Sequence, residues 1–121
     1  MLGAAFAVHN ALGPALLESA YEGALSVELR QLRLHLERQV VYQLAYRGEY
    51  VGAYVADLVV EDTVILELKS VKALSATMEA QLINYLKLSG LPVGYLLNFC
   101  NVRVEWKRFV NQLKQGANTG D

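Results

Sequence analysis

The feature that most constrains the fold is an apolar run in two parts, residues 54–60 and 64–69, separated by a polar tripeptide at 61–63. Val, Ile and Leu dominate both parts, and such residues favour β-strands, whereas Glu-Asp-Thr between them is typical of a turn. The run is therefore predicted to form a β-hairpin.

Charged residues interrupt this hairpin at Asp57, Glu67 and Lys69. Side chains alternate between the two faces along a strand, so Glu67 and Lys69 share a face. A three-residue turn sets Asp57 directly opposite Glu67, whereas a two-residue turn would oppose Asp57 to Leu66 and send the carboxylates to opposite faces. We favour the three-residue turn.

Two carboxylates opposed in this way repel each other, because directly opposed side chains have Cβ atoms about 5 Å apart. A divalent cation held by both would remove the repulsion, and Lys69 would then be placed to bind or polarise a water or a phosphate oxygen. The alternative is that Glu67 and Lys69 are surface positions of an edge strand, in ordinary ion pairs. Spacing alone leaves both interpretations open.

Composition excludes several classes of protein. A chain of 121 residues with 54% hydrophobic and 19% charged residues is typical of one globular domain. The formal net charge of −1 lacks the basic balance common in nucleic-acid binders, so such binding would need a local patch or a bound cation. No run approaches the roughly 18 apolar residues of a membrane span and no basic signal region begins the chain, so we expect a cytoplasmic protein without membrane contact. The single Cys100 excludes an internal disulfide framework.

The remaining segments predict helices and strands in a definite order. The expected helices cover residues 2–12, 14–34 and 75–89, and the expected strands besides the hairpin cover 36–47, 93–99 and 102–109. A helix between the third and fourth strands implies that these two are parallel. The predicted fold is α/β, in the order α-α-β-β-β-α-β-β, with a mixed five-stranded sheet flanked by helices. Residues 1–110 would form a single domain and 111–121 a flexible tail.

Two glutamates lie one turn apart in the predicted helix 14–34. Glu18 and Glu22 share a side with Tyr21 and Leu25, two residues of the apolar stripe, so the acidic side chains border the stripe that is expected to be buried. Glu18 either favours the positive end of the helix dipole or reaches a metal or a lysine under the sheet. On the preceding helix, His9 is interpreted as a structural residue, although the sequence leaves its role open.

The helix 75–89 carries polar side chains near its apolar stripe. Ser75 is a plausible N-cap, and Gly90 would end the helix. Gln81 and Tyr85 are four residues apart and therefore share a face. They either sit at the rim of an amphipathic helix or contribute to a site near the carboxylates.

Taken in order, a helical glutamate, a strand aspartate, Glu-x-Lys and then Gln-x-x-x-Tyr resemble the PD-(D/E)xK nuclease superfamily, in particular its RecB-like branch. His9, Gly13-Pro14, Leu16-Leu17-Glu18-Ser19 and Tyr21-Glu22 more closely resemble the bacterial and archaeal family named after its GxxExxY motif. The resemblance extends from about residue 3 to 110 and implies a restriction-endonuclease-like core.

The resemblance also implies a metal site. Asp57, Glu67 and the backbone carbonyl of Leu68 would bind Mg²⁺ or Mn²⁺, with Glu18 as an additional ligand, directly or through water. The chain departs from the family pattern at Ala15, where the motif has its glycine. This change could alter the start of the helix but removes no chemical group.

The implied activity is hydrolysis of DNA, or of RNA, by a metal-dependent nuclease of the endonuclease type. Lys69 would position the attacking water and stabilise charge in the transition state, and Gln81 and Tyr85 would orient that lysine or the phosphate backbone. Further phosphate contacts are expected from Lys72, Lys87, Arg103 or Lys107. Without a basic run, we expect recognition of shape or backbone and little reading of bases.

Two other interpretations remain open. The same fold could hold an idle site and act as a module that binds nucleic acid or a protein partner. An enzyme of another class could also use a two-carboxylate metal site. The aromatic-rich strand 102–109 would allow a homodimer if it lies at the edge of the sheet.

Overall fold

The computed structural model describes residues 1–111, which contain three helices and five strands. The helices are α1 (Leu2–Leu12), α2 (Glu18–Gln31) and α3 (Ala76–Ser89). The strands are β1 (Leu36–Tyr46), β2 (Glu49–Val60), β3 (Val64–Lys69), β4 (Val93–Asn98) and β5 (Glu105–Val110).

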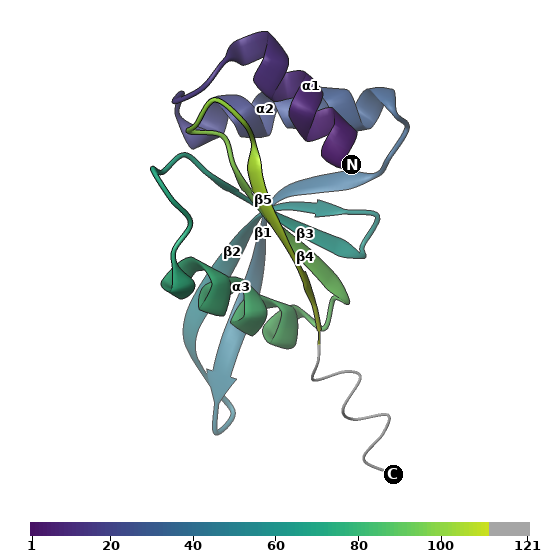
Figure 1. Cartoon of the computed structure of the whole chain (residues 1–121). Coiled ribbons are helices and arrows are strands. Elements are labelled where there is room, and N and C mark those ends of the chain that lie inside the picture. The colour runs from purple at the N-terminus through teal and green to yellow at the C-terminus, as the bar shows by residue number, and fades with distance from the viewer. Residues whose placement is uncertain (112–121) are drawn as a thin grey trace.

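The strands form a mixed five-stranded sheet in the order β1-β2-β3-β4-β5. β3 and β4 are parallel, and the other neighbours are antiparallel. Helices α1 and α2 lie together on one side of the sheet and α3 lies on the other (Figure 1). The α/β fold and the element order expected from the sequence are therefore confirmed.

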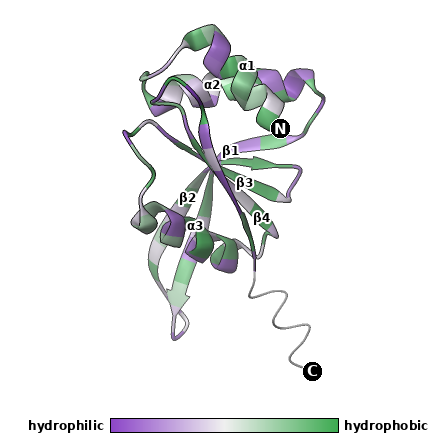
Figure 2. Cartoon of the chain, in the orientation of Figure 1, coloured by the Kyte–Doolittle hydropathy of each residue, from purple (hydrophilic) through white to green (hydrophobic). Residues whose placement is uncertain are grey.

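Each side of the sheet has its own apolar core. The core on the side of α1 and α2 includes Tyr21, Leu25, Leu66 and Phe99. The core beneath α3 is smaller and includes Tyr54, Ile65, Leu82, Leu86 and Leu96. The strands β3 and β4 between the helix layers are largely hydrophobic, whereas much of the edge strand β5 is hydrophilic (Figure 2).

The predicted register of the β2–β3 hairpin is confirmed. Val60 pairs with Val64 across a three-residue turn, and the ladder continues to the pair of Leu58 and Leu66. The longer hairpin of β1 and β2 contains a bulge, because Leu44 pairs with Gly52 whereas Ala45 pairs with Tyr50. The irregularity thus lies directly beside the glycine within the strand.

Helix α2 begins at Glu18, so the expectation that Pro14 opens it was wrong. Ala15 has φ 64°, in the left-handed region, and therefore the chain cannot run directly from Pro14 into a right-handed helix. Leu17 precedes the helix in an extended conformation. The predicted end at 34 was also late, because Arg33 has φ 61°.

Helix α3 has the caps expected from its sequence. The hydroxyl oxygen of Ser75 accepts a hydrogen bond from the backbone N–H of Met78, and Gly90 closes the helix with φ 76°. The helix packs closely on β4, since a Cβ added at Gly94 would lie 3.0 Å from a terminal carbon of Leu82. Gly94 thus sets how near α3 approaches the sheet.

The described chain ends at a buried residue. Asn111, expected to begin a flexible tail, is 6% exposed, and its side-chain amide donates to the carbonyl oxygens of Leu86 and Leu91. Residues 112–121 of the expected tail lie outside the described part. Strand β5 begins at Glu105, later than the predicted 102. Within residues 1–111, no helix is long and apolar enough to cross a membrane.

Candidate functional site

The carboxylates of Asp57 and Glu67 meet where the regular pairing of β2 and β3 ends. Asp57 Oδ2 accepts a hydrogen bond of 2.8 Å from the backbone N–H of Leu68. In return, Glu67 Oε1 accepts from the backbone N–H of Asp57 at 3.3 Å. Each side chain thus binds the main chain of the opposite strand, which fixes both acidic groups in one place.

Burial and mutual repulsion disturb the titration of this pair. Burial, reinforced by the charge of Asp57, raises the pKa of Glu67 from 4.5 to about 7. Burial also raises the pKa of Asp57, although the hydrogen bond from Leu68 opposes that shift. Burial is the larger cause in both groups, so the ionised form of each carboxylate is disfavoured at this site.

Lys69 lies half-buried at the end of β3, beside these carboxylates. Its positive charge acts to lower the pKa values of both Asp57 and Glu67. Among the described residues, its ammonium group forms no ion pair within 4.0 Å. The lysine is therefore near the carboxylates without being locked onto either of them.

The β1–β2 hairpin changes face at Gln39 and Asp57. A third acidic side chain, from α2, approaches the pair at the same level. Tyr54 and Ala56 pack in the core under α3, whereas Leu58 packs in the core under α2. Regular alternation would keep these even-numbered side chains on one face. Gln39, at φ 52°, lies at the level of Asp57 between the flanking pairs of the ladder.

The third acidic group is Glu22. It is 8% exposed, and its carboxylate accepts hydrogen bonds from Gln39 Nε2 at 2.6 Å and from Arg38 Nε at 3.0 Å. Its charge raises the pKa of Asp57. Glu18, the residue that the resemblance assigned to the metal, is exposed at the start of α2 beside a surface hollow that includes Ser70 and Cys100.

Two tyrosines border the carboxylates on the side of α3. The hydroxyl of Tyr54 donates a hydrogen bond to Glu67 Oε1, and the rings of Tyr54 and Tyr85 stack with 16° between their planes. Burial and the charge of Glu67 raise the pKa of both phenols, so both stay protonated. The structure thus brings Tyr85 to the acidic pair, whereas Gln81 is exposed on α3.

Asn98 holds the chain that follows Lys69. This fully buried residue pairs with Lys69 across β3 and β4, and its side chain exchanges hydrogen bonds with both backbone groups of Val71. Its amide also donates to Glu105 on β5. The end of β3 is therefore fastened to the neighbouring strands.

The residues present suit a hard divalent cation. Both hydrogen bonds that Glu67 accepts within the described chain use Oε1, which leaves Oε2 as a ligand atom. Asp57 Oδ2 accepts from Leu68, and the Gln39 side chain also stabilises the Asp57 carboxylate. Carboxylate and carbonyl oxygens are the ligands that Mg²⁺ and Mn²⁺ prefer. An ion there would also favour the ionised form of both carboxylates, which burial disfavours.

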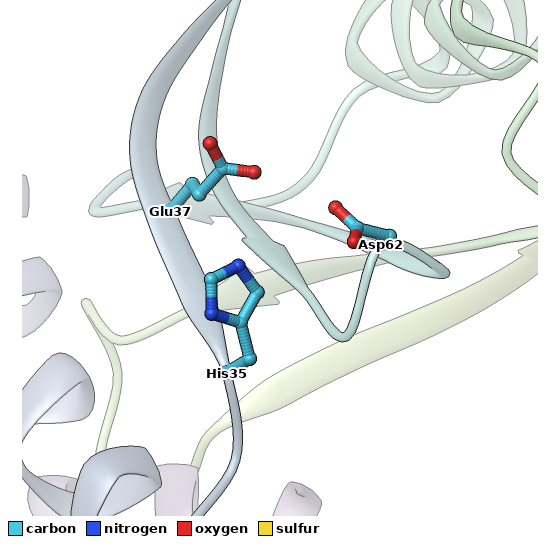
Figure 3. Close-up of side chains that lie close together, drawn as sticks. All are labelled: His35, Glu37 and Asp62. Carbon is cyan, nitrogen blue, oxygen red and sulfur yellow. The ribbon is translucent and has the colours of Figure 1, made fainter.

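A separate cluster of two carboxylates and a histidine lies at the β2–β3 turn, away from this site along the hairpin. Ligand atoms of His35, Glu37 and Asp62 lie within 4.8 Å of one another (Figure 3). The backbone N–H of His35 binds the Glu61 carboxylate, which holds the turn against the start of β1. These three side chains are exposed, and exposed acidic groups commonly converge without an ion.

Two other residues of the sequence motifs have structural contacts. Tyr21 is fully buried; its hydroxyl donates to the carbonyl of Gly13 at 2.6 Å and accepts from the N–H of Leu16 at 3.0 Å. His9 is buried, and its ring Nε2 lies 2.8 Å from the carbonyl oxygen of Asn101. Both contacts hold loops in place, as expected for His9.

Comparison with known proteins identifies a family and a similar fold. A family model described as the PD-(D/E)XK nuclease superfamily matches residues 1–109. The crystal structure of SSO0001 has a similar fold, with a TM-score of 0.56 and 19% sequence identity over 82% of this chain. The chain spans 55% of that protein. A search of curated proteins found no match.

Proposed function

Because the chain belongs to the PD-(D/E)XK nuclease superfamily, we propose that it is a nuclease that hydrolyses DNA phosphodiester bonds with bound Mg²⁺ or Mn²⁺. One observation carries the proposal. Asp57 and Glu67 converge beside Lys69, and within the described chain neither carboxylate forms an ion pair. A pair with only a structural role would more simply be neutralised by an ion pair.

The proposed ligands are Asp57, Glu67 and the Leu68 carbonyl. When bound, the ion would supply charge for the developing oxyanion and lower the pKa of a water. The backbone hydrogen bonds to Asp57 and Glu67 orient the ligand oxygens. The Tyr54 hydroxyl holds Glu67 from the other side. Such support keeps ligands near their working geometry.

Lys69 is proposed to orient the attacking water and to stabilise charge on the phosphate. Its half-buried amine stands beside the carboxylates, where a phosphate oxygen would approach. Tyr85 would help to orient the backbone of the substrate through its protonated hydroxyl. Gln81, which is exposed on the same helix, would contact the substrate only at the rim.

We further propose that the chain is a GxxExxY protein. Tyr21 of that motif ties together the loop from Gly13 to Leu16, which supports a structural role for the motif. Glu22, which follows Tyr21, binds the side chains of Arg38 and Gln39, and its charge acts on Asp57. We therefore assign the influence of α2 on the site chiefly to Glu22 and leave Glu18 as an outer, water-mediated ligand.

The proposal is tested by incubating branched, single-stranded and duplex DNA with the protein and Mg²⁺ or Mn²⁺. We expect the native protein to cut at least one substrate, and Asp57→Ala or Lys69→Ala to reduce the rate by about 100-fold or more. Asp62→Asn is the matched control, because it removes an exposed carboxylate at the turn of the same hairpin, from the cluster with His35 and Glu37. It should retain full activity.

Other outcomes would overturn the proposal. Equal cutting by the native protein and both variants would identify the activity as a contaminant. Loss of activity in Asp62→Asn alone would move the metal to the β2–β3 turn. Absence of cutting on every DNA substrate, and on RNA, would favour a module that binds nucleic acid or a protein partner.

A further inference from the structure

A mostly apolar hollow of about 540 Å³ opens between the β1–β2 hairpin and α3. Leu44, Gly52 and Tyr54 line it from the hairpin, and Tyr85 and Lys87 line it from the helix. Its volume lies within the range of about 300–1,000 Å³ found for pockets that hold small organic ligands. The hollow is therefore large enough for a nucleoside-sized group.

Aromatic rings form one wall of this hollow and continue beyond it. Tyr54 stacks between Tyr42 and Tyr85, with interplanar angles of 15° and 16°. The two outer residues, Tyr42 and Tyr85, are half-buried, and Tyr85 lines the hollow. Flat aromatic surfaces of this kind bind nucleobases by stacking, with little dependence on which base is bound.

The stacked tyrosines also contact the acidic pair. The Tyr54 hydroxyl binds Glu67, and the charges of Glu67 and Asp57 act on the Tyr85 phenol. Lys87 supplies a positive charge at the hollow, where a phosphate next to a stacked base would lie. The hollow and the carboxylates thus adjoin through shared side chains.

We propose that this hollow holds an unpaired nucleobase and that the substrate strand is single-stranded where it enters the site. The inference rests on the proposed nuclease function and specifies its substrate. Bases within a duplex have both faces covered by their neighbours, so only an unstacked base can offer a face to Tyr85. The chain has a net charge of −1 and so attracts phosphates less than a protein with a basic groove would. Stacking would therefore supply a larger share of its affinity for nucleic acid.

Binding is measured by fluorescence anisotropy in EDTA, where no metal is present. The probes are a labelled single strand of about ten nucleotides, an abasic strand of equal length, and the duplex. The abasic strand keeps every phosphate but has no base to stack. We expect the native protein to bind the normal strand at least about 5-fold more tightly than the abasic strand and the duplex.

Variants separate stacking from other contributions. Tyr85→Ala should remove the preference for the normal strand, whereas Tyr85→Phe keeps the ring and should retain it. Asn84→Leu adds a branched apolar side chain without a ring at an exposed position of α3 that lines the hollow, and should also remove the preference, even if Tyr85→Ala fails to fold. Lys87→Gln should weaken binding of the normal and abasic strands alike. Arg30→Gln, which removes an exposed charge in the last turn of α2, should change the affinity for neither strand.

Equal affinity of the native protein for normal and abasic strands would overturn the inference, and so would tighter binding of the duplex. No binding of any nucleic acid would also overturn it and favour a peptide as the occupant. The result is independent of catalysis. A base preference without cleavage contradicts only the nuclease, and cleavage without a base preference contradicts only the stacking site.

Discussion

Ala15 shows how one residue can keep a backbone conformation that its side chain disfavours. Its φ of 64° lies in the left-handed region, where a Cβ costs about 1 kcal/mol or more relative to glycine. The hydroxyl of Tyr21 holds the loop on both sides of Ala15, through Gly13 and Leu16. The glycine of the GxxExxY motif at this position therefore has a physical reason, which concerns the loop and not the start of α2.

We predict that Ala15→Gly raises the free energy of unfolding by about 1 kcal/mol, because the strain disappears while no contact of consequence is lost. Urea unfolding measures the change. Ala20→Gly is the matched control, since Ala20 is exposed within α2 and glycine there should destabilise by about 1 kcal/mol. Destabilisation by both substitutions would contradict the assignment of strain to Ala15.

The acidic pair predicts a pH dependence of stability in EDTA. The pKa of Glu67 is about 7 in the folded chain against an ordinary 4.5, so the folded protein holds an extra proton between these values. The unfolding free energy should therefore fall as pH rises from about 5 to 8, by at most about 3 kcal/mol. Unfolding by urea at a series of pH values measures this slope.

Glu67→Gln should flatten the slope, because the amide cannot ionise. Both proteins retain His9 and His35, so the difference between their pH profiles isolates Glu67. Glu49→Gln, at an exposed position of β2, should behave like the native protein. Identical profiles for the native protein and Glu67→Gln would exclude a raised pKa at this carboxyl.

Among the elements, α3 depends on one glycine for its distance from the sheet. Gly94→Ala would place a Cβ 3.0 Å from Leu82, which is fully buried and cannot retreat freely. We predict a loss of about 1–3 kcal/mol in the free energy of unfolding. Gly52→Ala, where a Cβ meets nothing within 4 Å, should change it by less than about 0.5 kcal/mol.

Thermal or urea unfolding of both variants checks this contrast. Because α3 carries Tyr85, a displaced helix should also weaken binding of single-stranded DNA by Gly94→Ala. An equal effect of the two substitutions would show that packing of α3 on β4 does not limit stability.

The elements also show what sequence patterns could predict. The turn at 61–63 sets the register of β2 and β3, so the meeting of Asp57 and Glu67 followed from counting along two short strands. The start of α2 did not follow, because proline at a first helical position is only a preference and Ala15 adopts a positive φ. Local rules succeeded where the local geometry is regular.

At the scale of the whole molecule, the main omission was Glu22. Helical spacing places Glu18 and Glu22 on one side but does not reveal which end of the helix faces the sheet. The hairpin also changes face at Gln39 and Asp57, which strict alternation excludes. Tyr54 and Asn98 were missed for a similar reason, since their partners Glu67 and Val71 are distant in sequence and follow only from the assembled sheet.

The crossed hydrogen bonds of Asp57 and Glu67 have one more consequence. Each carboxylate accepts a hydrogen bond from the main chain of the other strand, so a shift of the hairpin register by one residue would break both hydrogen bonds. A mispaired chain would therefore lack the acidic pair altogether. If the chain has the nuclease activity proposed above, the fraction of active molecules would measure the fraction in which the sheet has assembled correctly.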